Sequence, residues 1–343
     1  MKATIKDVAK LAGTSFKTVS RVINHENTVG EKLSARVWAA AKELNYQPNI
    51  SARQMRGGAS FIAYIYDNPN SHYVIEMQNG ILQECHNQGY ELLIHPIDFK
   101  SSNAVTELER LVSSSHIAGL VLTPPFSESA ELIDLLLSRK MNFARIVSGS
   151  SAPDTLGPCV FIDDCKAAYA ITDYLIKQGH RRIAYLGSAE TDPSSVERLK
   201  GYTAALADHG ISNEETLVLP GEYNFDSGAE RTNILLSADT PPTAIFACND
   251  EIAAGALFAA RIKQVAVPEQ LSIAGFEDSP FSRQSWPKLT TAHQSNTEIA
   301  ATATRNLVQA IRASRQEETE DAELQTGFVP KLVIRESTCQ APE

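Results

Sequence analysis

The chain has 343 residues, of which 43% are hydrophobic, so it is long enough for two or three domains with a large buried core. Its formal net charge of −10 argues, taken alone, against a nucleic-acid partner. No apolar run reaches the ~20 residues of a membrane span, the N-terminus lacks the apolar stretch of a signal peptide, and the five cysteines show no zinc-ligand spacing, so we expect a cytoplasmic protein without a metal site.

Residues 4–24 predict two short amphipathic helices. The first has apolar residues with the i, i+3, i+4, i+7 spacing of one helix face, at Ile5, Val8, Ala9 and Ala12. Gly13 interrupts this run, and a second apolar stripe follows at Phe16, Val19 and Ile23. Two short helices joined by such a turn form a helix-turn-helix, whose second helix can lie in a DNA major groove. The alternative is an amphipathic hairpin packed against another domain.

The second of these helices carries polar side chains suited to phosphates and base edges, namely Ser15, Lys17, Thr18, Ser20, Arg21 and Asn24. Residues 1–58 hold ten Lys and Arg against four Asp and Glu, a net charge of +6. The rest of the chain holds 21 basic and 37 acidic residues, a net charge of −16. A basic head on an acidic body is typical of a DNA-binding module attached to a regulatory domain.

A third helix is predicted over roughly residues 32–44, with Gly30 near its N-cap and Pro48 as its stop signal. The next segment, residues 49–55, is too short and too polar to form a stable helix alone. A glycine pair at 57–58 then separates the head from the body.

From residue 61 onward, apolar strands alternate with amphipathic helices, which predicts parallel sheets with helices on both faces. The first set of strands is expected at 61–66, 90–97, 117–123 and 143–147, and the second at 159–164, 182–188, 216–220, 243–248 and 271–276. Nine strands exceed the mean number of strands in one sheet, so we expect an α/β body of two consecutive doubly wound subdomains. Ligands bind beyond the carboxyl ends of such strands, where two subdomains can share a cleft.

Two segments of the head carry a family resemblance: TIKDVAKLAGTSFKTVSRVIN at 4–24 and VGEKLSARVWAAAKELNYQPN at 29–49. They resemble the DNA-binding segment, third helix and hinge entry of the lac repressor/galactose repressor family of bacterial transcriptional regulators. The likeness is dense over residues 4–58 and looser beyond, through VFIDD, GHRRIAYLGS, ERLKGY, FACNDEIAAGAL, IAGFEDSPF and WPKLTTAHQ. It implies a body with the fold of periplasmic sugar-binding proteins, in which the chain crosses between subdomains three times.

We place these crossings near residues 161, 291 and 322. The expected organisation is a helix-turn-helix domain at 1–48, a hinge helix and linker at 49–58, an N-terminal effector subdomain at 59–161 and 292–321, and a C-terminal effector subdomain at 162–291 and 322–343. The family's tetramer-forming members carry a C-terminal leucine heptad, which residues 335–343 lack, so a homodimer is expected.

The sequence offers no motif for catalysis. It has no GxGxxG after a strand, no Walker A loop, no GxSxG and no HExxH, so we expect no catalytic residues, no cofactor and no enzyme activity. Asp163 and Asp164 follow a strand, where adjacent residues point to opposite faces; a helix cap and a ligand contact both remain open. A transport-type binding protein is disfavoured by the basic head and the missing signal peptide.

Candidate effector residues lie just beyond strands or at helix starts, and their aromatic rings and polar groups suit a polyhydroxylated ligand. They are Tyr73, Thr123, Arg198, Tyr223, Asn249, Glu277 and Gln294. By resemblance, Arg198, Asn249 and Glu277 match the family's effector contacts, and Tyr223 and Gln294 match further ones. Asn249 and Asp250 are also suited to cap the next helix, and Asp250 is left out of the predicted site.

The chain departs from the family pattern at three positions. Glu277 stands in GFE where the family has Asp in GFD, so a longer side chain changes the size of the pocket. Asp192 stands where purine-responsive members carry a basic residue, which argues against a purine. Met55 replaces the leucine that wedges into the DNA minor groove, and Met is also an intercalating residue type.

The resemblance implies a repressor that binds a near-palindromic DNA operator as a homodimer in the cytoplasm, at the nucleoid. A small molecule, expected to be a sugar or sugar derivative, would rotate one subdomain and change the spacing of the two hinges, to release or to tighten the operator. Major-groove bases would be read by Phe16, Lys17 and Arg21, phosphates held by Thr4, Ser15, Thr18 and Asn24, and the minor groove contacted by Ala52, Arg53, Met55 and Arg56.

Overall fold

The computed structural model describes residues 3–23, 29–44, 46, 61–68, 71–113, 116–188, 192–316 and 324–342. The chain divides into two units, residues 1–60 and residues 61–343. The predicted hinge at 49–58, with the wedge residue Met55, and residues 317–323 lie outside the described residues.

The head contains three helices, α1 (Ile5–Ala12), α2 (Phe16–Ile23) and α3 (Glu31–Glu43). Each turns an apolar stripe inward, and the buried residues from the three helices form one small core: Val8, Ala9, Ala12, Val19, Val22, Ile23, Val37, Ala40 and Ala41. The periodicity therefore predicted all three helices, and the observed α3 begins and ends within one residue of the expected range.

The turn between α1 and α2 depends on Gly13. Its φ of 62° lies in the left-handed region, which glycine adopts at helix ends without steric cost. Arg36 of α3 donates a hydrogen bond of 2.6 Å to the carbonyl oxygen of Ala12, an orphan acceptor at the end of α1. The third helix thus fixes the turn that orients α2.

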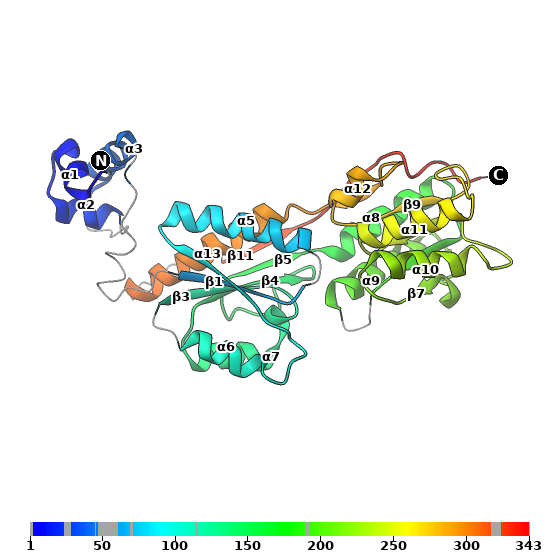
Figure 1. Cartoon of the computed structure of the whole chain (residues 1–343), viewed down its shortest axis with the longest axis horizontal. Helices are drawn as coiled ribbons and strands as arrows, with labels where there is room; N and C mark the ends of the chain where they lie inside the picture. The colour runs from blue at the N-terminus through cyan, green and yellow to red at the C-terminus, as the bar shows by residue number, and fades with distance from the viewer. Residues whose placement is uncertain are drawn as a thin grey trace. The chain divides into compact units, whose positions relative to one another are not determined.

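The first subdomain of the body is built on a parallel six-stranded sheet in the order β11-β5-β4-β3-β1-β2. Its strands are β1 (Phe61–Tyr66), β2 (Glu91–Pro96), β3 (Ile117–Leu122), β4 (Phe143–Ser148), β5 (Cys159–Ile162) and β11 (Gln325–Phe328). Helices cover both faces: α5 (Ser71–Gln88) and α13 (Asn296–Gln316) lie on one, and α6 (Ala104–Val112) and α7 (Ala130–Ser138) lie on the other (Figure 1). The short helix η1 (Phe126–Glu128) precedes α7.

The second subdomain has a parallel four-stranded sheet in the order β7-β6-β8-β9 and a separate antiparallel pair, β10 with β12. The strands are β6 (Ile183–Leu186), β7 (Val218–Leu219), β8 (Ala244–Ala247), β9 (Ser272–Ala274), β10 (Thr291–His293) and β12 (Lys331–Val333). Its helices are α8 (Asp164–Lys177), α9 (Pro193–Asp208), η2 (Glu215–Leu217), α10 (Phe225–Leu235), α11 (Asp250–Ile262) and α12 (Pro280–Gln284).

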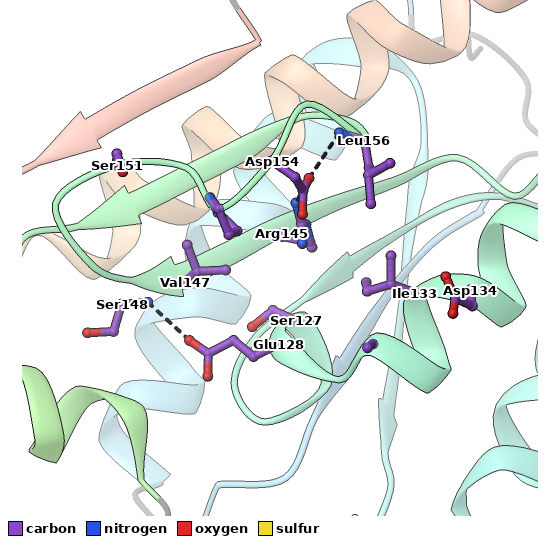
Figure 2. Close-up of a pocket in the computed structure, with 12 residues that line it drawn as sticks. Ser127, Glu128, Ile133, Asp134, Arg145, Val147, Ser148, Ser151, Asp154 and Leu156 are labelled. Atoms are coloured by element: carbon purple, nitrogen blue, oxygen red, sulfur yellow. Dashed lines mark hydrogen bonds and ion pairs between the residues drawn. The ribbon is translucent and has the colours of Figure 1, made fainter.

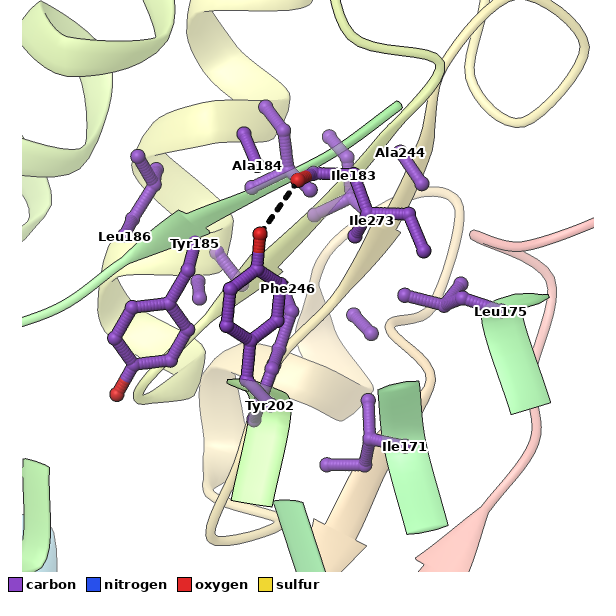
Figure 3. Packing of buried hydrophobic residues seen from close by; sticks show 14 of the residues in the cluster. Ile171, Leu175, Ile183, Ala184, Tyr185, Leu186, Tyr202, Ala244, Phe246 and Ile273 are labelled. Carbon is purple, nitrogen blue, oxygen red and sulfur yellow. Dashed lines mark hydrogen bonds between the residues drawn. The ribbon is translucent and has the colours of Figure 1, made fainter. Parts of the chain in front are cut away.

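The core of this subdomain packs aromatic rings around the central strands (Figure 3). Tyr185 of β6 stacks on Tyr202 of α9, with ring centroids 5.3 Å apart, and meets Phe246 of β8 edge-on at 5.4 Å. The hydroxyl of Tyr202 donates to the carbonyl oxygen of Ile183 at 2.9 Å, so this buried polar group is satisfied. Strands buried on both faces explain why they read as continuous apolar runs.

All nine predicted strands are present, but two assignments to a subdomain need correction. Residues 159–164 were placed in the second set, whereas β5 pairs with β4 and β11 in the first sheet. Residues 322–343 were placed in the second subdomain, whereas β11 returns to the first sheet. The chain therefore crosses after Ile162, after His293 and after Phe328. An apolar run predicts a strand, but it does not predict which other strand it pairs with.

Close helix packing depends on Gly201 of α9, because a Cβ there would lie 2.1 Å from the carbonyl oxygen of Cys165 in α8. We expect Gly201→Ala to lower the free energy of unfolding by about 2–3 kcal/mol, since backbone must move apart to admit the methyl group. The matched control is Gly157→Ala, whose Cβ would have only ordinary contacts. Urea denaturation of both variants checks this; equal effects would contradict the packing argument.

Candidate functional site

The second helix of the head presents the three predicted base-reading side chains to solvent. Phe16, Lys17 and Arg21 are exposed, and Phe16 retains 51% of its surface although it is aromatic. Val19 and Val22 of the same helix are buried in the head core. One face of α2 is thus held by packing and the other is open to a partner.

Three of the four predicted phosphate-binding residues, Thr4, Ser15 and Thr18, lie at helix N-termini, where free backbone N–H groups and the helix dipole favour anions. Ser15 precedes α2, and its Oγ accepts from the backbone N–H of Thr18 at 3.1 Å. Thr4 precedes α1, and its N–H donates to the Asp7 carboxylate at 2.8 Å. The remaining predicted DNA contacts, Asn24, Ala52, Arg53, Met55 and Arg56, lie outside the described residues.

A cavity of about 900 Å³ lies between the two subdomains of the body, at the carboxyl ends of their strands. Five of the seven predicted effector residues line it: Tyr73, Arg198, Tyr223, Glu277 and Gln294. They come from α5, α9, the loop before α10, the segment after β9 and the segment after β10. The fold therefore brings together residues spread over more than two hundred positions of the chain.

Arg198 is the most constrained residue of this cavity. It is 3% exposed, and its Nε donates to Asp164 Oδ1 at 2.8 Å. Its Nη1 donates to the carbonyl oxygen of Cys248 at 2.6 Å and to the hydroxyl of Tyr223 at 3.0 Å. The guanidinium carbon lies 3.8 Å from the ring centroid of Phe276, a cation–π distance. The sequence predicts Arg198 at the start of a helix, whereas it lies five residues after Pro193, the first residue of α9.

The charge on Arg198 is held by its neighbours. Burial opposes the charge, but Asp164, Tyr223 and Glu277 keep the pKa of Arg198 well above its ordinary value. Burial raises the pKa of Asp164, against the opposing effects of Arg198 and of Ser148. The two buried side chains form an ion pair, supplemented by Glu277, whose Oε1 lies 3.8 Å from Nη1 of Arg198.

Of the two adjacent aspartates, Asp163 and Asp164, one is a helix cap and the other lines the cavity. Asp163 caps α8, because its Oδ1 accepts from the N–H of Lys166 at 2.9 Å. Asp164 is buried, lines the cavity and pairs with Arg198. Asp192 combines both roles, since it lines the cavity and its Oδ1 accepts from the N–H groups of Ser194 and Ser195 at the start of α9.

Glu277, the residue that departs from the family motif, stands on strained backbone. Its φ is 97° and that of Asp278 is 58°, a region that side chains with a Cβ rarely adopt. The N–H of Glu277 donates to the carbonyl oxygen of Ala292 at 2.9 Å, which ties this turn to β10. Such strain is often stored at functional sites, where the surrounding structure holds it.

Two predicted effector contacts, Thr123 and Asn249, do not line the cavity. Both are fully buried. Thr123 Oγ1 donates to the carbonyl oxygen of Ile65 at 3.5 Å, and Asn249 caps α11 by accepting from the N–H of Ile252 at 2.7 Å. The fold thus uses the hydroxyl of Thr123 and the Oδ1 of Asn249, whereas the Nδ2 of Asn249 has no hydrogen-bond partner among the described residues. Asp250 also stays out of the cavity, as expected.

The cavity has further lining residues that the sequence analysis missed. They follow the carboxyl ends of β1, β2, β4 and β6, which is the same signal that indicated Tyr73, and include Tyr66, Asp67, Asp98, Phe99, Lys100, Ser148 and Ser188. Five carboxylates line the cavity, at Asp67, Asp98, Asp164, Asp192 and Glu277. Two cations, Lys100 and Arg198, oppose them, so the described lining has a formal charge of −3.

Buried Asp250 predicts a pH dependence of stability. Burial raises the pKa of Asp250 to about 7, against the hydrogen bonds it accepts from Thr291 and Ser279. Between pH about 4 and 7 the native state holds a proton that the unfolded chain has released. The free energy of unfolding therefore falls as the pH rises through this range. Asp250→Asn should flatten this slope in urea titrations across that window, and an unchanged slope would contradict the assignment.

Among the described residues, no group of His, Cys, Asp and Glu is arranged to hold a metal ion. Within the same residues no helix has the length and apolar character needed to cross a membrane.

A helix-turn-helix head joined to two doubly wound subdomains around a polar cavity defines a ligand-responsive DNA-binding protein. Comparison with known families agrees: residues 4–49 match the bacterial regulatory proteins of the lacI family, and residues 172–338 match a periplasmic binding protein-like domain. The chain belongs to the LacI family of transcriptional regulators, as its sequence resemblance indicated, and this family consists of regulators rather than enzymes.

Relatives match over nearly the whole chain. The HTH-type transcriptional repressor PurR of Actinobacillus pleuropneumoniae serotype 3 is 31% identical over 336 residues, covering 98% of both chains. The HTH-type transcriptional regulator DegA of Bacillus subtilis is 30% identical over 341 residues, also covering 98% of both. The structure of the transcriptional regulator CelR in complex with cellobiose has a TM-score of 0.72 and 27% identity, covering 98% of this chain and 100% of that one.

Proposed function

We propose that the chain represses transcription by binding a near-palindromic operator as a homodimer, and that a neutral sugar or sugar derivative in the cleft controls this binding. The observation that carries the effector half is the lining of the 900 Å³ cavity, where aromatic rings and paired polar groups surround the fixed guanidinium of Arg198. The protein would act in the cytoplasm, at the nucleoid.

On the DNA side, α2 would lie in the major groove. Arg21 and Lys17 can donate to guanine O6 and N7, and Phe16 can meet the methyl group of thymine. Ser15, Thr18 and Thr4 stand at helix N-termini, next to the backbone N–H groups that phosphates prefer, and Asn24 would add a further phosphate contact. The hinge residues Ala52, Arg53, Met55 and Arg56 would contact the minor groove, with Met55 as the wedge.

The effector class follows from charge and surface. A lining with a formal charge of −3 repels phosphates and carboxylates, so a neutral ligand is favoured. Tyr73, Phe99 and Tyr223 line the cavity and would pack against the C–H surfaces of a sugar, and the carboxylates would accept hydrogen bonds from its hydroxyls. The cellobiose complex of CelR supports this class. The family resemblance adds that Asp192 stands where purine-responsive members carry a basic residue, which argues against a purine.

Control would act through the two subdomains. A ligand that contacts both favours one relative orientation, and three chain crossings transmit this orientation toward the hinge. Coupling of about 1–3 kcal/mol between cleft and operator would be ordinary and must be reciprocal. The ligand would release or tighten the operator, depending on which orientation it favours.

The cavity should discriminate by charge. We expect cellobiose or another neutral sugar to bind at least about tenfold more tightly than its phosphorylated counterpart, because a phosphate adds anionic charge to an acidic site. Calorimetric titration of the full chain with both compounds checks this. Tighter binding of the phosphorylated sugar would contradict the proposed effector class without touching the DNA-binding half.

A further inference from the structure

A second cavity, of about 380 Å³, adjoins the cleft within the first subdomain. It lies between η1 and α7 on one side and the connection from β4 to β5 on the other (Figure 2). Val147 and Ser148 line both cavities, so a single strand end forms the wall between them.

Three residues that line this second cavity each hold a buried polar atom without a hydrogen-bond partner among the described residues: Ser127 Oγ, Glu128 Oε2 and Arg145 Nε. Ser127 is fully buried and Arg145 is 4% exposed. Buried polar groups in folded proteins are nearly always paired, so three such atoms in the walls of one cavity favour a polar occupant. None of the roles derived for the cleft uses these atoms.

The chemistry of the walls limits that occupant. Glu128, Asp134 and Asp154 oppose Arg145 alone, which is itself ion-paired with Asp154, so the described lining has a formal charge of −2 with Glu128 ionised and −1 with Glu128 protonated. This charge disfavours an anion. Hydroxyl groups both donate and accept, as the two oxygens and the guanidinium Nε require. Apolar side chains complete the walls, at Ile133, Val147, Pro153 and Leu156.

The wall is joined to the cleft by a chain of hydrogen bonds. Glu128 Oε1 accepts from the N–H of Ser148 at 3.3 Å, and Ser148 Oγ donates to Asp164 at 2.5 Å. Asp164 in turn accepts from Arg198. Burial raises the pKa of Glu128 to about 7, with Asp192 and Asp164 adding to this and the Ser148 N–H and Arg145 opposing it, so near neutrality this carboxyl group can donate as well as accept.

We propose that this second cavity is a binding site for a neutral polyhydroxylated molecule of monosaccharide size, held by Ser127, Glu128 and Arg145 and separated from the effector cleft by Ser148. The volume is at the lower end of the range of small-molecule pockets. This site does not depend on the identity proposed for the cleft effector.

The test uses the full chain, D-glucose as probe and glucose 6-phosphate as its anionic counterpart. Crystals soaked in glucose should show it against Ser127 Oγ, Glu128 and Arg145 Nε, and crystals soaked in glucose 6-phosphate should not. Equilibrium dialysis of labelled glucose counts sites in solution. Ser127→Leu, which fills the second cavity, should lose this site alone, and Ser188→Phe, which intrudes on the cleft, should retain it.

Ser127→Ala removes only the hydroxyl and guards against misfolding of the larger variant; it should weaken the same site by about tenfold. Ordered water alone in the second cavity at saturating glucose would overturn the proposal. So would an unchanged number of glucose sites in a folded Ser127→Leu chain, or occupation by the phosphate as readily as by glucose.

Discussion

Replacing Arg198 with methionine should abolish the response to any cleft effector and lower the free energy of unfolding of the body by about 3–5 kcal/mol. Arg198 is fully engaged by Asp164, Tyr223 and the carbonyl oxygen of Cys248. Removing it leaves Asp164 buried without its counter-ion, which is the costly half of the change. Urea denaturation and operator titration of the same variant measure both effects.

The double variant Arg198→Met/Asp164→Leu separates stability from recognition. Replacing a buried ion pair by apolar side chains of similar size is often neutral, so the double variant should regain most of the lost free energy of unfolding. Its effector response should stay absent, because the polar centre of the cleft is gone. A double variant that responds normally to effector would show that Arg198 only stabilises the fold.

Removing the Arg21 side chain should weaken operator binding by about 1–3 kcal/mol for each head that contacts DNA, and relax the preference at one base pair of each half-site. Arg21 lies on the exposed face of α2, opposite the buried Val19 and Val22. Fluorescence anisotropy with the operator and with single-base variants of it measures both the loss and the change of preference.

Lys42→Ala is the matched control, because it removes one positive charge from the exposed part of α3 without touching α2. Lys42→Ala should lower the affinity for all DNA sequences by the same factor, and by less than Arg21→Ala lowers the affinity for the operator. Equal losses for the two variants on every sequence would mean that Arg21 contributes charge rather than base recognition.

Local features of the fold were predictable because they repeat along the sequence. The apolar stripes of the head gave three helices, and the apolar runs of the body gave nine strands. The pairing of the strands was harder to predict. β11 follows a charge-rich stretch and is only four residues long, so it was not predicted, yet it pairs with β5 at the edge of the first sheet. The short strands β10 and β12 were missed because three residues carry too little periodicity.

The cleft shows the same division. Arg198, Tyr223 and Glu277 were identified through the family pattern, and the structure places them around one cavity. Thr123 and Asn249 also follow strands, but they are fully buried and their side-chain oxygens bond to backbone groups, which their positions in the sequence do not reveal. The ion pair of Asp164 with Arg198 joins residues 34 positions apart, and no local sequence pattern indicates such a contact.

The most direct test of the regulatory account is a titration of operator DNA with the full chain, in the presence and absence of a panel of neutral sugars. The account predicts that at least one sugar changes operator affinity by about 5- to 150-fold, and that the operator changes the affinity for that sugar by the same factor. Operator binding that no sugar alters would contradict allosteric control by a carbohydrate, and a chain that binds no DNA sequence specifically would contradict the account as a whole.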